Sequence, residues 1–196
     1  MYKEIIGIIA IAITIIAYIP YIRSIMNGKT KPHVFSWVIW GLVTFIVFLA
    51  QIDDGGGIGA WSIGVSGVFS IYVAVLAFIK KSDITISKID WSFFIVAIIS
   101  VLLWPITSDP LYSVLLLTTI DVCGFAPTFR KSYALPFSEP LLFFVIMTAR
   151  NIISAIALEN YSITTMFFPI VTGIAGLIFI LMVVYRRRAS TIKEAI

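Results

Sequence analysis

Long apolar stretches separated by short polar joins run through the whole sequence. Each stretch has about the length that crosses a bilayer as a helix, roughly 17–25 residues. Seven such segments can be placed, at residues 4–26, 33–51, 57–79, 90–106, 110–130, 139–158 and 162–185. Turn-forming residues fill the joins, among them Asn27-Gly28, Asp53-Asp54, Ser82-Asp83, Ser108-Asp109-Pro110 and Glu159-Asn160. The pattern predicts an all-α polytopic membrane protein with seven transmembrane helices.

The composition agrees with a protein that lies almost wholly in lipid. The chain is 60% hydrophobic and 12% charged, and its mean hydropathy is +1.06. Soluble domains carry about 25% charged residues, so most of this surface is expected to face lipid. The single Cys123 excludes an intramolecular disulfide and a cysteine metal cluster, and it fits a small buried apolar position. Only Lys3 precedes the first apolar segment, so we expect a retained helix and not a signal peptide.

The charges of the joins alternate along the chain. Every second join is basic, and these basic residues are Arg23, Lys29, Lys31, Lys80, Lys81, Lys88, Arg130, Lys131, Arg186, Arg187, Arg188 and Lys193. The charged residues of the opposite joins are all acidic, and they are Asp53, Asp54, Asp109 and Glu159. Basic residues in short joins mark the cytoplasmic side of a membrane. We therefore predict a multi-pass protein of the cell membrane, with its N-terminus outside and its C-terminus in the cytoplasm.

Two parts of the sequence, about a hundred residues apart, resemble each other. Pro20 and Arg23 match Pro127 and Arg130, and Thr30-Lys31-Pro32 matches Ser138-Glu139-Pro140 after a one-residue gap. Further along, Ser66-Gly67 matches Thr172-Gly173. Internal repeats of this kind fix the architecture of a chain, so we predict that the first three segments correspond to the last three.

The segment at 90–106 has no counterpart in this scheme. One additional crossing gives two three-helix copies the same orientation, so the repeat is predicted to be parallel, with its axis along the membrane normal. The predicted division is a first three-helix repeat at 1–81, a linker helix at 82–108, a second repeat at 109–188 and a cytoplasmic tail at 189–196.

This 3+1+3 plan resembles the PQ-loop superfamily, which includes the SWEET sugar transporters, cystinosin-like carriers and bacterial nicotinamide riboside transporters. Members carry a proline near the cytoplasmic end of the first helix of each repeat, often as Pro-Gln. Here the matching pairs are Pro20-Tyr21 and Pro127-Thr128, so both prolines are present and neither glutamine is. The resemblance implies passage of a small solute between two helix bundles.

The repeated prolines have two interpretations. A proline inside a helix removes a backbone hydrogen bond and bends the helix, so Pro20 and Pro127 serve either as hinges between moving bundles or as fixed kinks for packing. Thr30 and Ser138 each stand two residues before a proline, where we predict helix N-caps.

Two charged residues are predicted to lie deep in the bilayer. At ~1.5 Å per helical residue, Asp121 lies roughly 16 Å beyond Pro110, and Arg150 lies roughly 15 Å beyond Pro140. Both then reach the midplane of a hydrocarbon core of about 30 Å. An unpaired charge there is unfavourable by at least ~2.5–3.5 kcal/mol. We predict either a solute site, in which Arg150 and the neighbouring Asn151 hold an anionic group, or a structural ion pair that joins the two helices.

Further polar and aromatic residues are candidates for the same substrate-binding site. Trp37 and Trp40 lie three residues apart and share one helical face, and an aromatic wall with a few polar groups suits a small-solute pocket. Tryptophans at the membrane interface are the alternative interpretation. The repeat pairs Asp121 with the neutral Thr14. The remaining candidates are Ser36, Ser66, Thr148 and Thr172.

The sequence contains no nucleophile with a base, no metal-ligand spacing and no phosphate-binding loop, so we expect neither an enzyme nor a cofactor or metal site. The leading hypothesis is a transporter, uniporting or coupled to protons or cations, for a small polar or zwitterionic solute. Its expected partners are that solute, the lipid bilayer and a possible second copy in a homodimer, without nucleic acid. The alternative is a non-transporting membrane protein, such as an assembly factor, receptor or structural protein, that keeps the same fold.

Overall fold

The protein folds as a bundle of long helices. The computed structural model describes residues 2–82, 88–107 and 109–194. Within these ranges it contains helices and no strand, as predicted. The helices are α1 (Tyr2–Met26), α2 (Val34–Asp53), α3 (Ile58–Ile79), α4 (Lys88–Thr107), α5 (Pro110–Gly124), α6 (Ala126–Ala134), α7 (Leu141–Ala157) and α8 (Ile163–Glu194). Asp83 and Ser108, which belong to two predicted joins and to the predicted linker segment 82–108, lie outside the described residues.

Several of these helices are long and apolar enough to cross a membrane. Among the described residues, five spans meet both criteria, namely Tyr2–Met26, Val34–Asp53, Ile58–Ile79, Pro110–Ala134 and Ile163–Ser190. Helix α7 is also apolar but shorter, at 17 residues. The outward faces carry exposed isoleucine, leucine and phenylalanine side chains, such as Ile8, Ile16, Phe78 and Leu181. Since such surfaces are suited to lipid and not to water, the chain is a multi-pass membrane protein.

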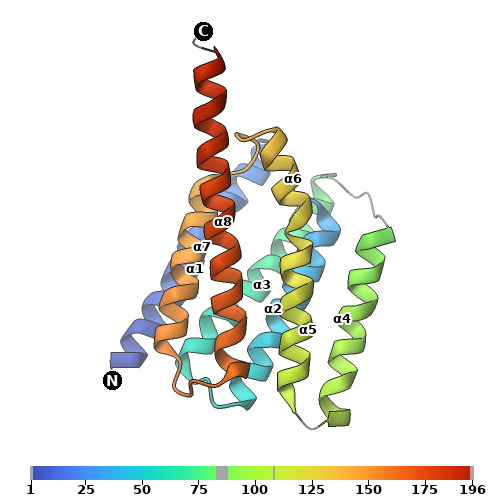
Figure 1. Ribbon diagram of the computed structural model, residues 1–196, viewed down its shortest axis with the longest axis vertical. Coiled ribbons are helices and arrows are strands. Elements are labelled where there is room, and N and C mark those ends of the chain that lie inside the picture. The colour runs from blue at the N-terminus through green and yellow to red at the C-terminus, as the bar shows by residue number, and fades with distance from the viewer. Residues whose placement is uncertain (1, 83–87, 108, 195–196) are drawn as a thin grey trace.

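The helices alternate in direction along the bundle (Figure 1). Helices α1, α3, α5 and α8 run toward the end that carries the C-terminus, and α2, α4 and α7 run back toward the end that carries the N-terminus. The acidic joins at 54–57 and 158–162 therefore lie together at the N-terminal end, and the basic joins lie at the other end. The tail predicted at 189–196 is helical as far as Glu194, because α8 continues beyond the bundle.

We divide the helices other than α4 and α6, in chain order, into a first group, α1 to α3, and a second group, α5, α7 and α8. In the first group α3 contacts both α1 and α2, and in the second group α8 contacts both α5 and α7. Between the groups, α1 packs against α7 and α2 packs against α5. Helix α4 packs on α5 and touches α2, so it lies at one side of the bundle. The interior between α1, α2, α5 and α7 is where polar side chains can be enclosed.

Two of the glycines in α3 are required at helix contacts. A Cβ atom on Gly67 would lie 2.9 Å from the backbone nitrogen of Phe45, and one on Gly64 would lie 2.7 Å from the ring of Phe48. Both contacts join α3 to α2 within the first group. Glycine allows this approach because it lacks a side chain.

The start of α2 differs from the prediction. The N-cap is His33 and not Thr30: the His33 Nδ1 accepts a hydrogen bond from the backbone N–H of Ser36 at 3.3 Å. The Ser36 hydroxyl lies 2.8 Å from the same ring nitrogen. The helix begins only after Pro32 and His33, so the nearest side-chain acceptor is the histidine. Thr30 is hydrogen-bonded to Ser24 instead, at 2.6 Å.

The start of α7 also differs. Its N-cap is Pro140, which has no side chain able to accept a hydrogen bond, and the buried Ser138 hydroxyl has no partner among the described residues. The prediction that Ser138 caps this helix is therefore wrong. The neighbouring Glu139 is held by Lys131 of α6 across 2.8 Å, and this ion pair fixes the turn that precedes α7.

The two prolines predicted as hinges lie in different environments. Helix α1 continues without interruption through Pro20 to Met26. In the second group, α5 ends at Gly124 and a separate helix α6 begins at Ala126, with Pro127 in its first turn. Proline has no N–H to donate to the preceding turn, and the helical ladder is interrupted at this point.

Candidate functional site

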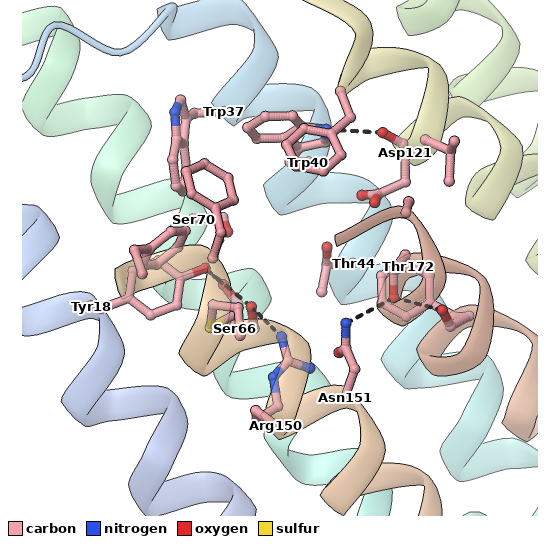
Figure 2. Close-up of a pocket in the computed structure, with 17 residues that line it drawn as sticks. Tyr18, Trp37, Trp40, Thr44, Ser66, Ser70, Asp121, Arg150, Asn151 and Thr172 are labelled. Atoms are coloured by element: carbon pink, nitrogen blue, oxygen red, sulfur yellow. Dashed lines mark hydrogen bonds between the residues drawn. The ribbon is translucent and has the colours of Figure 1, made fainter. Parts of the chain in front are cut away.

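A cavity of about 130 Å³ lies between the two helix groups. It is lined by six helices, α1, α2, α3, α5, α7 and α8, and Figure 2 shows the side chains that surround it. Its polar and tryptophan lining consists of Tyr18, Trp37, Trp40, Thr44, Ser66, Ser70, Asp121, Arg150, Asn151 and Thr172. Its apolar lining consists of Val122, Phe125, Phe143, Phe144, Met147, Phe168 and Ala175. Predicted site residues from both halves of the chain thus meet in one space.

Arg150 is the buried cation of the site. It projects from α7 with 3% of its surface exposed, and its Nη2 donates a hydrogen bond to the Ser66 hydroxyl at 3.2 Å. Its Nε and Nη1 atoms have no hydrogen-bond partner in the part of the chain that the structure describes. A guanidinium has five N–H donors, so most of its capacity to donate remains unused.

Asp121 lies on the facing wall, on α5. The backbone carbonyl of Asp121 accepts a hydrogen bond from the Trp40 indole at 3.2 Å, which ties α2 to α5. Within the described ranges, its carboxylate forms no hydrogen bond and no ion pair within 4.0 Å. In Figure 2 the carboxylate and the Arg150 guanidinium point into the same space from opposite walls. The structural ion pair considered above is therefore not formed, and the two opposite charges remain separate.

The Asn151 amide, next to Arg150 in the chain, is also fixed by hydrogen bonding. Asn151 Nδ2 donates to the Thr172 hydroxyl at 3.0 Å, and Thr172 donates to the Phe168 carbonyl at 2.6 Å. This chain joins α7 to α8. The Asn151 Oδ1 is buried without a partner in the described part of the protein, so the site offers an unused acceptor next to the unused donors of Arg150.

Tyr18 is linked to Arg150 through the hydroxyl of Ser66. Its hydroxyl lies 3.1 Å from the Ser66 hydroxyl and 2.8 Å from the Ser70 hydroxyl. The same Ser66 accepts from Arg150, so α1, α3 and α7 share one hydrogen-bonded network. Sequence reasoning missed both Tyr18 and Ser70. Their spacing was the available signal, because Tyr18 and Ser70 each lie four residues, about one helical turn, after a polar residue, Thr14 or Ser66.

Three of the predicted site residues lie outside the cavity. Thr14 is fully buried, and its hydroxyl donates to the Ala10 carbonyl of its own helix at 2.7 Å. Ser36 belongs to the His33 cap at the start of α2. Thr148 lies against Gly176 and faces a groove between α7 and α8 on the outside of the bundle. The predictions for Thr14, Ser36 and Thr148 are therefore wrong as cavity residues, because a helix that is apolar on every face does not reveal which turn points inward.

Thr44 is a further cavity residue that sequence reasoning missed. It follows Trp37 and Trp40 on the inner face of α2, at the i, i+3 and i+7 positions that share one side of a helix. Trp37 and Trp40 both line the cavity, as predicted. Their rings lie 5.4 Å apart and edge to face.

An aromatic cluster packs beside the cavity toward the basic end. Tyr21 of α1 packs against Trp37 of α2 at 5.0 Å between ring centroids, and against Phe143 of α7 at 4.6 Å. The Tyr18 ring adds a contact with Phe143 at 5.3 Å. These rings belong to both helix groups, and they touch by ring packing.

Hydrogen bonds join the helices at the opposite, acidic end. Gln51 of α2 donates to the Thr165 carbonyl of α8 at 2.6 Å, and Ser154 of α7 donates to the Gly59 carbonyl of α3 at 2.7 Å. Both bonds cross from the first helix group to the second. The two ends of the cavity thus differ in chemistry, with polar bonds at one and aromatic rings at the other.

The joins at the acidic end add further contacts between the helices. Asp54, after α2, accepts hydrogen bonds from Ser162 through its carboxylate and from Asn160 through its carbonyl, the latter at 2.8 Å. The Glu159 backbone N–H donates to the Gly56 carbonyl at 3.1 Å. The loops of the two groups are therefore tied together at several points.

Comparisons with protein-family models, with curated proteins and with solved structures give no match to this chain. Among the described residues, no three His, Cys, Asp or Glu side chains come together in a way that holds a metal ion. The chemistry of the site thus comes from one guanidinium, one carboxylate, amide and hydroxyl groups, and aromatic rings.

Proposed function

We propose that this protein is a transporter that carries a small polar solute across a membrane. The observation that carries the proposal is the cavity itself: two unpaired charges of opposite sign face each other inside a membrane-embedded bundle. Buried charges in membrane helices are unfavourable and mark solute or ion pathways. A protein without such a task would gain stability from apolar side chains at these two positions.

The proposed architecture is the 3+1+3 repeat, with α4 as the seventh span and as the linker between the repeats. Helices α1, α2 and α3 then correspond to α5–α6, α7 and α8. The contacts support this correspondence, because exchanging each helix for its counterpart turns the α1–α7 contact into the α5–α2 contact. The same exchange turns the α3–α1 and α3–α2 contacts into α8–α5 and α8–α7. In this scheme a pseudo-twofold axis along the membrane normal passes near the cavity.

The lining of the cavity supports the same scheme. Counterpart positions line it from both sides in two pairs, Tyr18 with Phe125 and Ser66 with Thr172. A site on the axis between two repeats is the arrangement that alternating access requires, because rocking of one unit against the other then exposes the same site to each side in turn.

The hydrogen bonds at the acidic end and the aromatic cluster at the basic end are proposed as two gates of the cavity. Transport in this scheme breaks the hydrogen bonds at the acidic end or separates the aromatic rings at the basic end, but not both at once. The interruption between α5 and α6 at Phe125 supports a movable basic end, since a broken helix bends more easily than a continuous one. We further propose that the basic end is cytoplasmic and that the protein resides in the cell membrane.

The experiment is uptake into liposomes that contain the purified full-length protein. Labelled sugars, polyols, nucleosides and amino acids are offered with and without a pH gradient. We expect at least one solute to enter, and we expect Arg150→Gln and Asp121→Asn to abolish or strongly reduce entry. The matched control is Thr119→Val, which changes an exposed side chain on the same helix as Asp121.

Folding of each variant is checked by its elution as a single species and by its melting temperature. If no solute enters under any gradient, the transporter proposal fails, and a non-transporting protein such as an assembly factor, receptor or structural component becomes the better explanation of the fold. Entry that is unchanged in both charge variants would separate transport from this cavity.

A further inference from the structure

The separation of the two charges in the cavity narrows the class of solute. We infer that the site takes a small zwitterion, with its carboxylate on Arg150, its ammonium group on Asp121 and an apolar side chain against the aromatic and methionine lining. This inference rests on the proposed function, since it concerns the same cavity. It goes beyond that function by assigning a role to each wall.

The Arg150 wall is built for an oxyanion. The guanidinium is held in place by its single hydrogen bond to Ser66, and its Nε and Nη1 are left without partners among the described residues. Planar, fixed N–H donors match the two oxygens of a carboxylate and form short, charge-assisted hydrogen bonds. Ser66 is itself positioned by the Tyr18 hydroxyl at 3.1 Å, so the cation is preorganised.

The Asp121 wall is built for a cation. An ionised carboxylate only accepts hydrogen bonds, and no donor in the described part of the chain reaches it. The Trp40 ring lies beside it, held by the bond from its indole to the Asp121 carbonyl, and the Phe125 ring lies 5.9 Å from that of Trp40. An ammonium group next to a carboxylate and aromatic faces gains from both.

The formal charges of the two walls sum to zero, and this excludes the simpler solutes. An anion would satisfy Arg150 and leave Asp121 unpaired in a buried space, and a cation would do the reverse. A neutral polyol would leave both charges without a counterion. Leaving a buried charge uncompensated is strongly unfavourable, so only a solute that carries both charges satisfies the whole site.

The remaining lining determines the body of the solute. Phe143, Phe144, Met147 and Phe168 line the same cavity as the two charged residues. Such a lining buries apolar surface well, and the flexible methionine side chain adapts to different shapes. The solute class is therefore an amino-acid-like zwitterion with an apolar side chain.

The test uses sets of related compounds that differ in charge. Uptake of labelled L-leucine and L-phenylalanine into liposomes with the full-length protein is measured in competition with unlabelled compounds. The competitors are the parent amino acid, its amide, which keeps only the ammonium charge, its N-acetyl derivative, which keeps only the carboxylate, and the neutral polyol myo-inositol. Thermal stabilisation of the detergent-solubilised protein by the same compounds measures binding without transport.

We expect the parent amino acid to compete at least about tenfold better than either singly charged derivative, because each derivative can form only one of the two charge-assisted interactions. In the two charge variants the order of the compounds is read from thermal stabilisation, because these variants are expected to take up little solute. There the advantage over the N-acetyl derivative should disappear in Asp121→Asn, and the advantage over the amide should disappear in Arg150→Gln. Thr119→Val should keep the wild-type order. A merely structural role for the two charges would weaken all compounds equally. If Arg150→Gln does not fold, Arg150→Lys keeps the charge and should retain the preference for the parent compound over the amide.

The inference is overturned if a neutral or singly charged solute enters while the zwitterions neither enter, compete nor stabilise, and in that case the proposed transport function stands. It is also overturned if both charge variants keep the wild-type order of competitors. If neither the amino acids nor any solute of the wider panel enters, the proposed function fails and this inference fails with it.

Discussion

Replacing Arg150 with methionine tests whether the charge of this residue serves solute binding or stabilises the fold. The substitution keeps much of the length of the side chain and removes the charge. A charged side chain at the centre of a membrane is unfavourable by roughly 2.5–3.5 kcal/mol on insertion scales. The same substitution deletes the hydrogen bond from Arg150 to Ser66 at 3.2 Å, and a hydrogen bond to a charged group contributes about 1.5 kcal/mol at the lower end of its range.

The difference between these two free energies is favourable to the variant. Subtracting ~1.5 from ~2.5–3.5 leaves about 1–2 kcal/mol, so Arg150→Met should be more stable than the wild type by that amount. The Ser66 hydroxyl stays paired, because Tyr18 still lies within hydrogen-bonding distance of it. The same variant should take up no solute.

The assay is unfolding of the purified protein in bicelles or mild detergent, followed by circular dichroism, together with liposome uptake. Arg130→Met serves as the matched control. Arg130 is an exposed arginine at the basic end, and its replacement should change the free energy of unfolding by less than about 0.5 kcal/mol. If Arg150→Met instead lowers the free energy of unfolding by about 2 kcal/mol or more, within the range for breaking a structural polar network, and Arg130→Met leaves it unchanged, the reasoning is refuted. Arg150 would then hold the bundle together.

Substitutions at three further positions test the helix contacts at the acidic end and the N-cap of α2. Gly59→Ala should lower the free energy of unfolding by about 1–3 kcal/mol in the same assay. The reason is that the added Cβ would lie 2.5 Å from the backbone nitrogen of Leu158. An unchanged free energy of unfolding would mean that α3 and α7 separate freely at this contact. Gln51→Leu should remove the bond to the Thr165 carbonyl at the acidic end and speed the labelling of cysteines introduced into the cavity; labelling at the wild-type rate would contradict a gate. His33→Ala should remove about 1 kcal/mol of stability by deleting the α2 cap, whereas His33→Asn should restore most of it.

The sequence predicts the positions of the helices well, because lipid imposes a length and an apolar character on every span. The predicted segments at 33–51 and 57–79 correspond to Val34–Asp53 and Ile58–Ile79. The predicted depth of Asp121 and Arg150 comes from the same arithmetic, and the structure places both residues in the lining of the central cavity. Charges in a span are rare enough that their positions alone point to the interior.

The rotation of each helix about its axis is harder to predict. Lipid-facing and core-facing surfaces are equally apolar here, so hydropathy does not separate Thr14, which bonds its own backbone, from Tyr18, which lines the cavity. Local backbone chemistry is the second difficulty. The break at Phe125 and the cap at His33 depend on where each helix resumes near a proline, and the hydrophobic pattern does not contain this information.

The bond between the Trp40 indole and the Asp121 carbonyl gives the protein an intrinsic optical probe. This indole lies in the cavity wall, and it would come within 3.0 Å of a Cβ atom on Gly124, at the point where α5 ends. Trp61 and Trp91, by contrast, are exposed on the outside of the bundle. Replacing Trp61, Trp91 and Trp104 with phenylalanine would leave Trp37 and Trp40 as the remaining tryptophan emitters, both in the wall of the cavity. Their fluorescence would then follow solute entry and helix movement in real time, without any attached dye.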